Sequence, residues 1–272
     1  MLTFFIFSKD RPLQLHALLS SIVSYCSPLP SVLVLYRASN DKFRRCYGEV
    51  FKELSGRLDV LAVHEDYSFA DHVRLMVDFI ATPTIAFLVD DIVFIRPFDF
   101  KDLLPWSKRG YIPSLRLGFQ TTYSYMTDST QKLPPFRKKG GFLTWSWGQG
   151  GLDWSYPLSV DGNLFDRQEI RRLLTQIKFH SPNTLEQSLQ KFNPVFRRKT
   201  GICFFNPVLL NIPCNKVQSD FVGNRSGELD THQLVKVWES GKRIYFEAFR
   251  DISTNSVHVE LPLTFVPREA AW

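Results

Sequence analysis

Two adjacent carboxylates, Asp90 and Asp91, directly follow the apolar run 84–89 and are called the acidic pair below. Five of the six residues in that run are apolar, which favours a strand buried on both faces of a parallel sheet. Two charges at the tip of such a strand repel each other and lose hydration unless a cation lies beside them. Divalent cations bind carboxylate oxygens, and open α/β sheets bind ligands at the carboxyl ends of their strands. The segment therefore predicts a metal-dependent site on an α/β fold.

The two carboxylates are expected to have unequal roles. Successive side chains of a strand point to opposite faces, so both can serve one site only where the strand ends. Asp91 is the better metal ligand, because Asp90 is still continuous with the strand. We expect Asp90 to bind a ribose hydroxyl or a water beside the metal. The alternative is a strand-end turn or a salt-bridged surface pair.

Polar side chains also follow the first expected strand, residues 2–7. Ser8, Lys9 and Arg11 lie there, and Asp10 is placed to cap the helix that comes next. The carboxyl ends of parallel strands share one edge of a sheet, so this loop should neighbour the acidic pair. Lys9 or Arg11 would face a diphosphate at that edge. The alternative is a helix cap flanked by solvated charges.

The next two strands end in the same way. Tyr36 and Arg37 end the second expected strand, and Glu65 and Asp66 follow the third. These residues should lie on the same edge of the sheet, where we expect Tyr36 and Arg37 to contact the nucleotide.

The elements that position these side chains alternate between strand and helix over the first hundred residues. Apolar runs and helical stripes predict four strands (2–7, 31–36, 58–63 and 85–89) and three intervening helices, the first with Pro12 in its first turn and the second at 41–54. The third helix carries Val73, Met76, Val77 and Ile80. Such a series implies a parallel sheet with right-handed crossovers.

After residue 100 the pattern becomes less regular. Strands are expected at 111–117, 142–147 and 202–205, and helices at 167–177, from Ser181 onward with Pro182 first, and at 229–238. Residues 119–141 show no periodicity and are expected to form a long loop. Loops of this length are usually functional or disordered. Since no linker or repeat is visible, residues 1–272 are expected to form one domain.

The order of these parts resembles that of GT-A fold glycosyltransferases of the family 2-like type. Those enzymes begin with a strand and a polar loop containing Arg-Pro, and their fourth strand ends in a DXD-type acidic motif, which Val89-Asp90-Asp91 matches. The polar turn 37–41 corresponds to their turn after the second strand, although Tyr36-Arg37 replaces the usual Asp. The resemblance implies a Rossmann-like, mostly parallel central sheet flanked by helices. Residues 1–100 would bind the nucleotide sugar, and the less regular half, 101–272, would bind the acceptor.

The resemblance also implies a catalytic base and an additional metal ligand. The family uses a carboxylate at the start of a later helix as the base of an inverting reaction, and Glu186, expected in the first turn after Ser181, fits. Asp153 and Asp161 are its rivals; Asp161 precedes Gly162 and suits a structural turn. Several such enzymes add a C-terminal His to a Mn²⁺ or Mg²⁺ ion, and His258 resembles it. The alternatives are a capping Glu and a hydrogen-bonded polar His.

Aromatic and basic residues offer further contacts with ligands. Asp153 beside Trp154 could bind a sugar, and an aromatic cluster could form an acceptor platform or pack in the core (Trp145, Trp147, Trp154 and Tyr156). The basic runs 137–139 and 197–199 could guide an anionic acceptor, such as a lipid-linked phosphate, or lie in solvated loops.

Composition narrows the class of protein. The net charge is +6, which favours phosphate-bearing partners or an anionic membrane surface, and no stretch reaches the roughly 18 apolar residues of a membrane span. The four cysteines have no metal-type spacing and are expected to be free thiols in a reducing compartment. The match of 224–226 to a glycosylation acceptor then carries no meaning. We expect a cytoplasmic protein, peripheral to a membrane at most.

Three functions compete. The first is a metal-dependent glycosyltransferase that uses a UDP- or GDP-type sugar donor and a glycan or lipid-linked acceptor, with no nucleic-acid partner. The second is a sugar nucleotidyltransferase, which normally has a Gly-rich phosphate loop after the first strand; residues 8–12 contain no Gly. The third is a non-catalytic module that binds sugars or nucleic acid.

Overall fold

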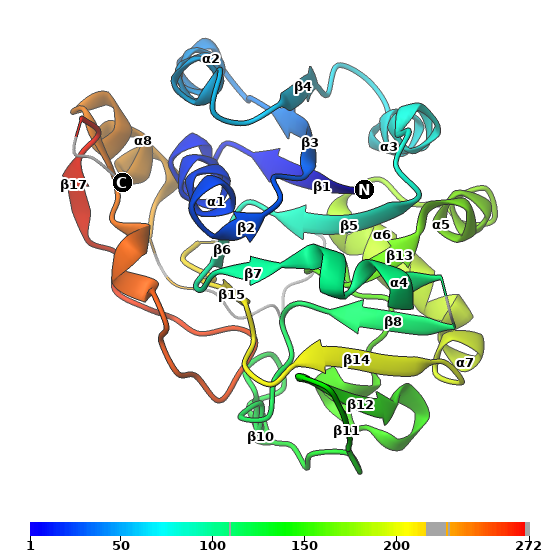
Figure 1. The fold of residues 1–272 in the computed structure, drawn as a ribbon. Helices are drawn as coiled ribbons and strands as arrows, with labels where there is room; N and C mark the ends of the chain where they lie inside the picture. Colours follow the sequence, from blue (N-terminus) through cyan, green and yellow to red (C-terminus); the bar gives the residue numbers. More distant parts are fainter. Residues whose placement is uncertain (109, 216–226, 228, 270–272) are drawn as a thin grey trace.

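A five-stranded sheet forms the centre of the molecule, in the spatial order β13-β5-β1-β3-β4 (Figure 1). The protein is seen here in a computed structural model that describes residues 1–108, 110–215, 227 and 229–269. Four of the strands are parallel, and β13 runs antiparallel at one edge: β1 (Leu2–Lys9), β3 (Ser31–Arg37), β4 (Val60–His64), β5 (Thr84–Val89) and β13 (Leu164–Asp166). The predicted α/β class with a mostly parallel central sheet is confirmed.

Helices cover both faces of this sheet. The alternating side chains of β1 divide the core: Phe4 and Ile6 join the cluster under α1 and α2, and Phe5 and Phe7 join the cluster under α3 and α5. The helices are α1 (Pro12–Tyr25), α2 (Asp41–Leu54), α3 (Phe69–Phe79) and α5 (Arg167–Leu174). The expected order of strands and helices in the first hundred residues is thereby confirmed.

The sequence predicted that Asp10 caps α1, and this prediction is wrong. Arg11 is the N-cap residue, and the described residues provide no side-chain capping bond there. Asp10 instead adopts a left-handed backbone (φ 55°), and its carboxylate accepts hydrogen bonds from the Ser39 backbone N (2.7 Å) and Oγ (2.5 Å). A carboxylate tied to the turn after β3 cannot reach the first turn of α1. Asp10 therefore fixes the two loops at the carboxyl edge against each other.

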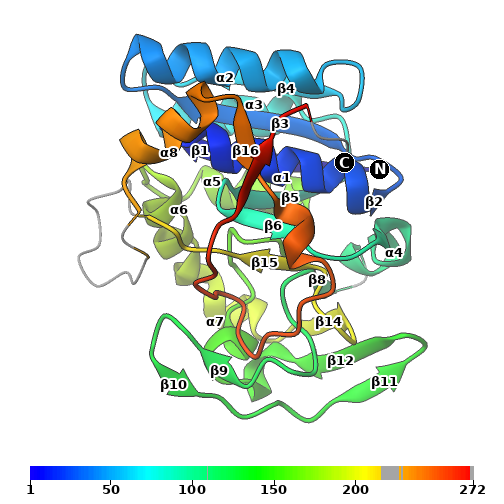
Figure 2. The same cartoon turned by 90° about the vertical axis from the view of Figure 1, so that its left-hand side faces the viewer.

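A second, smaller sheet lies beyond the β13 edge of the first (Figures 1 and 2). Its order is β11-β12-β14-β8, and only β14 and β8 are parallel within it: β8 (Tyr111–Ser114), β11 (Arg137–Lys139), β12 (Phe142–Ser146) and β14 (Thr200–Phe204). The predicted structureless loop 119–141 is wrong in part, because it contains β11 and the hairpin of β9 (Tyr123–Ser124) and β10 (Ser129–Thr130). Paired backbone groups give this polar stretch an order that periodicity does not reveal.

Shorter elements complete the chain. The remaining helices are α4 (Leu104–Ser107), α6 (Pro182–Leu189), α7 (Asn193–Phe196) and α8 (Thr231–Glu239), and 3-10 turns lie at Phe100–Asp102, Trp147–Gln149, Leu152–Ser155, Gln190–Phe192 and Phe246–Phe249. Three two-stranded ribbons join distant segments: β2 (Cys26–Ser27) with β7 (Phe98–Asp99), β6 (Ile92–Phe94) with β15 (Leu209–Asn211), and β16 (Lys242–Ile244) with β17 (Phe265–Pro267). The 224–226 match lies outside the described residues.

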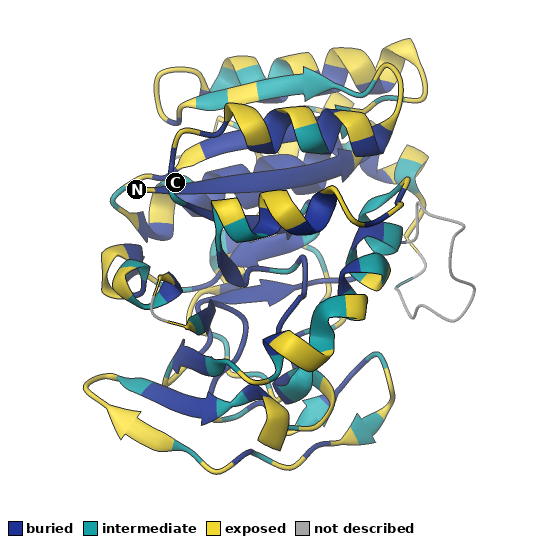
Figure 3. Ribbon diagram, turned by 90° about the vertical axis from the view of Figure 1, so that its right-hand side faces the viewer, coloured by how far each residue is buried: buried dark blue, intermediate teal, exposed yellow. Residues whose placement is uncertain are grey.

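Three of the four aromatic residues proposed as a platform belong to the core. Trp145, Trp147 and Trp154 are buried, and the Trp154 indole N donates a hydrogen bond to the Thr121 carbonyl (2.9 Å). Figure 3 shows that buried residues fill the central strands, whereas β11 lies in the exposed outer ribbon. The basic run 137–139 is thus solvated. All four cysteines are buried and free, and no described helix is long and apolar enough to cross a bilayer.

Candidate functional site

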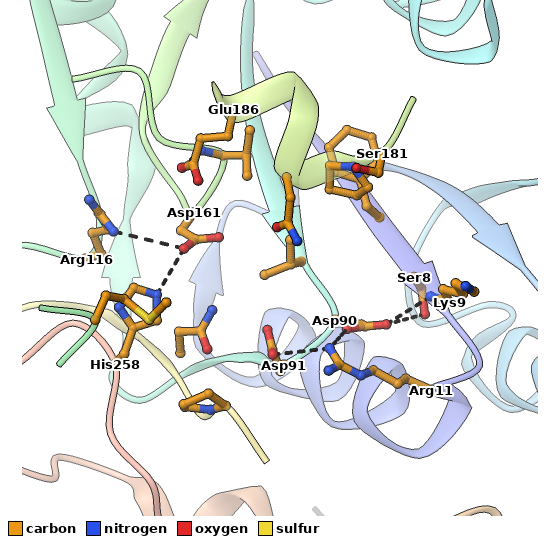
Figure 4. Close-up of a pocket in the computed structure, with 18 of the residues that line it drawn as sticks. Ser8, Lys9, Arg11, Asp90, Asp91, Arg116, Asp161, Ser181, Glu186 and His258 are labelled. Atoms are coloured by element: carbon orange, nitrogen blue, oxygen red, sulfur yellow. Dashed lines mark hydrogen bonds and ion pairs between the residues drawn. The ribbon is translucent and has the colours of Figure 1, made fainter. Parts of the chain in front are cut away.

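A cavity of about 830 Å³ opens at the carboxyl edge of β1, β3 and β5 (Figure 4). One wall comes from the strand ends, including Ser8, Lys9, Arg11, Arg37, Asp90 and Asp91. The opposite wall comes from the second half of the chain, including Arg116, Asp153, Tyr156, Asp161, Glu186 and His258. Its size lies in the range of cavities that bind small molecules and cofactors. The fold therefore brings the predicted catalytic, metal and donor-binding residues other than Tyr36 to one cavity, although they come from both halves of the chain.

A guanidinium supplies the cation that the acidic pair was predicted to need. Arg11 Nη1 lies 2.9 Å from Asp90 Oδ1 and 3.2 Å from Asp91 Oδ2, and the arginine side chain is 9% exposed. Burial by itself lowers the pKa of Arg11, but the two carboxylates outweigh it and raise that pKa above its ordinary value. Arg11 therefore remains charged and faces the acidic pair directly.

Asp90 is fully engaged by neighbouring groups. Its Oδ1 accepts from Arg11, and its Oδ2 accepts from the Ser8 hydroxyl (2.8 Å) and the Lys9 backbone N (3.2 Å). Ser8 is held in turn by the Tyr47 hydroxyl (2.6 Å), to which the Arg11 backbone N donates (3.0 Å). Asp90 thus binds the β1–α1 loop to the end of β5, a structural task that the sequence did not anticipate.

Asp91 keeps one oxygen unengaged. Among the described residues, its buried Oδ1 has no hydrogen-bond partner, and its Oδ2 contacts Arg11. Burial raises the pKa of Asp91 to about 6; Arg11 counteracts this, while the charges of Asp90 and Asp161 add to it. One guanidinium therefore does not fully compensate the two carboxylates. Asp91 is the member of the pair that can still accept a cation or a donor group.

Asp161 and His258 meet across the cavity from the acidic pair, beside Arg116 (Figure 4). Asp161 Oδ2 lies 3.3 Å from His258 Nε2 and 4.0 Å from Arg116 Nη1. Burial raises the pKa of Asp161, but the hydrogen bond and charge of His258 and the charge of Arg116 outweigh this and lower the pKa. The turn expected at Gly162 is present, with φ at +83°, yet Asp161 itself is an ionised member of the cavity wall.

Glu186 projects into the cavity from the second turn of α6, not from the first turn as predicted. Ser181 caps this helix with Thr184 as its reciprocal partner, so the capping alternative for Glu186 is wrong. Glu186 Oε1 accepts from the Val160 backbone N at 3.0 Å. Burial raises its pKa to about 7, with a further rise from Asp161 and opposition from Arg116 and from hydrogen bonds. A carboxyl group with this pKa can take up and release a proton near neutral pH.

Asp153 and Tyr156 form the neighbouring part of the wall. Gln131 holds Asp153 at both its carboxylate (3.0 Å) and its backbone N (3.1 Å), and Arg116 Nη2 lies 3.7 Å from the carboxylate. Trp154 turns away into the core, so the proposed stacking of a sugar on its ring is wrong. Tyr156 is the member of the aromatic cluster that lines the cavity, and burial together with Glu186 raises its pKa above the ordinary value.

The end of β3 contributes less than the sequence suggested. Arg37 lines the cavity and pairs with Glu65 at 3.3 Å. The Tyr36 ring instead packs against the rings of Tyr47 and His64, with centroids 4.7 and 5.2 Å away, and it is not among the described residues that line the cavity. Side chains alternate along β3, so Tyr36 and Arg37 point to opposite faces. The expected nucleotide contact of Tyr36 is therefore not supported.

Arg116 belongs to the cavity wall, although the sequence did not predict it. This residue is 3% exposed, and neither its Nε nor its Nη2 has a hydrogen-bond partner among the described residues. A signal was available, because Arg116 lies between Leu115 and Leu117 and is the single charge in the expected strand 111–117. A buried guanidinium with unspent donors is suited to bind oxygen atoms of a ligand.

The unpaired polar atoms of Asp91 and His258 are suited to bind a divalent ion whose remaining ligands come from a substrate. Asp91 Oδ1 and His258 Nδ1 are both buried and unpaired within the described part of the chain, and both are ligand types that Mn²⁺ accepts. The described residues include no cluster of three or more acidic, His or Cys side chains that could hold an ion alone. Mg²⁺ is commonly bound by one or two carboxylates together with substrate phosphates and water. The chain offers that kind of partial ligand set.

Comparison with known proteins gives similarity in the backbone only. No protein-family model matches the chain, and a search of curated proteins finds no match. TarS from S. aureus is similar to 75% of this chain, with a TM-score of 0.48 and 10% identity, and the chain spans 35% of the length of TarS. A nucleotidyl transferase from Methanothermobacter thermautotroptrophicus is similar over 76% of this chain and 88% of its own, with a TM-score of 0.43 and 14% identity. The mannosyltransferase PcManGT from Pyrobaculum calidifontis, solved with GDP-Man and Mn²⁺, is similar over 34% of this chain and 28% of its own, with a TM-score of 0.30 and 15% identity.

Proposed function

We propose that this chain is a glycosyltransferase that moves a sugar from a nucleotide-sugar donor to a hydroxyl group of a glycan or glycolipid. The observation that carries the proposal is the meeting of two chemically different walls in one cavity. The acidic pair with Arg11 and Lys9 lies on one side, and Glu186, with a pKa near 7, lies on the other. The first wall suits a diphosphate leaving group, and the second suits removal of a proton from an acceptor.

On the first wall, this chain's residues bind and orient the donor. Lys9 and Arg11 bring positive charge to the edge where β1, β3 and β5 end. Asp91, together with His258 from the opposite wall, would hold a Mn²⁺ or Mg²⁺ ion that also binds oxygen atoms of the donor. Such an ion, when bound, neutralises charge on the diphosphate. Asp90 would keep the loop and the strand end in register and, in contrast to the sequence-based expectation, would not bind ribose.

On the second wall, Glu186 would act as the base. Its carboxylate takes the proton of the acceptor hydroxyl while that oxygen forms a bond to the anomeric carbon of the donor sugar. The bond from the anomeric carbon to the diphosphate oxygen breaks, and its electron pair leaves with the diphosphate. A single displacement of this kind inverts the anomeric centre. Beside Glu186, Asp153 would accept hydrogen bonds from sugar hydroxyl groups, and Arg116 would donate hydrogen bonds to them.

The decisive experiment follows the products formed from a panel of donors. The panel includes UDP-GlcNAc and GDP-mannose, incubated with acceptor glycans and with Mn²⁺, Mg²⁺ or a chelator. Release of a nucleoside diphosphate that depends on acceptor, with loss of at least about 100-fold in Glu186→Gln, supports the proposal. Formation of a nucleotide sugar from a sugar phosphate and a nucleoside triphosphate, with release of pyrophosphate, would identify a nucleotidyltransferase instead. Sugar or nucleic-acid binding without turnover would identify a binding module.

A further inference from the structure

Arg11 occupies the place where a cation would approach the acidic pair. We propose that Arg11 is a built-in cation that competes with a divalent ion for Asp90 and Asp91, so that the ion binds weakly before the diphosphate of the donor arrives. This inference rests on the proposed use of a metal at the same site. It adds a property that the acidic motif alone does not imply, namely a low affinity for the free ion set by one residue of this chain.

The position of Arg11 is fixed from several sides. Its backbone N donates to Tyr47, its Nη1 contacts a carboxylate oxygen of both acids, and its Nη2 donates to the Asn215 carbonyl. The side chain is 9% exposed, and the carboxylates of Asp90 and Asp91 are 4% and 11% exposed. Buried ion pairs are screened little by salt, so this contact persists at physiological ionic strength.

Competition follows from charge and from the available oxygen atoms. All the contacts of Asp90 are directed to Arg11 and to the β1–α1 loop, so a divalent ion that used its oxygens would have to displace those donors. Asp91 Oδ1 is open, but Asp91 Oδ2 contacts the guanidinium at 3.2 Å. An ion bound to the open oxygen would lie close to a positive charge that is held in place. Each like charge at such a distance lowers the affinity for the ion.

The acidic pair nevertheless retains a need for positive charge. One guanidinium faces two buried carboxylates, and Asp91 Oδ1 has no hydrogen-bond partner among the described residues. A diphosphate adds negative charge and oxygen ligands at the same time, and both offset the repulsion between the ion and the guanidinium. Ion and donor would therefore bind together more tightly than either binds alone. The two affinities must be coupled reciprocally.

The test measures Mn²⁺ affinity in the absence of nucleotide, by titration calorimetry on the full chain. Arg11→Gln removes the charge and is expected to tighten Mn²⁺ binding about tenfold or more, whereas Arg11→Lys should stay close to wild type. Arg37→Gln is the matched control, because it removes a positive charge from the same cavity without touching the acidic pair. It should change the affinity by no more than about twofold. Adding Asp91→Asn to Arg11→Gln should abolish the gain.

Weaker Mn²⁺ binding by Arg11→Gln would overturn the inference. If Arg11 only positions the two acids, Arg11→Gln disorders them and weakens Mn²⁺ binding; an unchanged affinity also excludes competition. Circular dichroism and thermal unfolding check the fold of each variant. If Arg11→Gln does not fold, Arg11→Gln/Asp90→Asn removes the cation and its most buried partner together. This double variant should then bind Mn²⁺ through Asp91 at least as tightly as wild type, and weaker binding would refute competition. Donor turnover by wild type is scored separately, so a failed transferase assay is not confused with a failed competition test.

Discussion

Asp161 Oδ2 lies 3.3 Å from His258 Nε2, across 97 residues of sequence. This contact joins the turn before β13 to the segment that follows the last 3-10 turn, and the Arg116 guanidinium lies 4.0 Å from the same oxygen. One carboxylate thereby positions an imidazole and a guanidinium on the cavity wall. Because Asp161 is buried and its pKa is lowered, its charge contributes to stability as well as to the site.

We predict that Asp161→Asn lowers the free energy of unfolding by about 3 kcal/mol at pH 7, because it leaves a buried Arg116 with one distant partner. The contribution of Asp161 is present above the pKa of the unfolded carboxyl and is lost as the pH falls through the lower, folded pKa. Urea denaturation at pH 7 measures the loss. Asp78→Asn is the control, since Asp78 pairs with Arg171 on the surface and should change stability little. Equal effects of the two variants would contradict the prediction.

The rate of transfer should rise with pH as Glu186 loses its proton. Its pKa is raised to about 7, and a base acts only when ionised, so kcat/KM should increase to a plateau with a midpoint near pH 7. A pH–rate profile measures this limb, and Glu186→Gln should lose both the rate and the limb. The folded state also holds this proton more tightly than the unfolded state. Wild type should therefore lose stability relative to Glu186→Gln as pH rises from 4.5 to about 7. A limb that survives in Glu186→Gln would assign the base to another residue.

The two members of the acidic pair should respond oppositely to neutralisation. Asp90→Asn should lower the free energy of unfolding by about 3 kcal/mol, because Asp90 accepts from Arg11, Ser8 and the Lys9 backbone. Asp91→Asn should keep or increase stability above pH 6, since it removes a charge whose pKa is raised by burial. Thermal unfolding measures both effects. Asp91→Asn should at the same time lose turnover that depends on Mn²⁺, whereas wild-type turnover in that variant or in chelator-treated protein would sink the metal role.

Trp154 and Tyr156 should separate stability from substrate binding. Trp154→Phe removes a buried indole and its hydrogen bond to Thr121, so it should lower the free energy of unfolding by about 2 kcal/mol and leave KM unchanged. Tyr156→Phe should change stability little and raise KM several-fold, because the Tyr156 side chain lines the cavity. Chemical denaturation and steady-state kinetics on the two variants test this pair. A raised KM in Trp154→Phe would contradict this prediction and would indicate that the Trp154 ring contacts a sugar.

The sequence determined the elements whose signals are local. The apolar run 84–89 favoured a buried strand, the apolar stripe after Pro12 favoured a helix with one buried face, and acids at a strand end indicated the carboxyl edge where ligands bind. Residue types alone also implied that the acidic pair needs a cation. Each of these conclusions depends on neighbours within a few residues, which periodicity and chemistry describe directly.

Only the tertiary structure decided which groups meet. The Arg11 guanidinium faces the acidic pair, because the end of β1 lies beside the end of β5. Asp161 lies in the site, where it contacts His258. Tyr36 lies outside the site, because its ring points to the face of β3 that packs against Tyr47. Packing decides which of several side chains far apart in the sequence pairs with a cation, holds a proton or forms a hydrogen bond. The order of strands indicated which loops share an edge of the sheet, but it did not indicate which side chains pair across that edge.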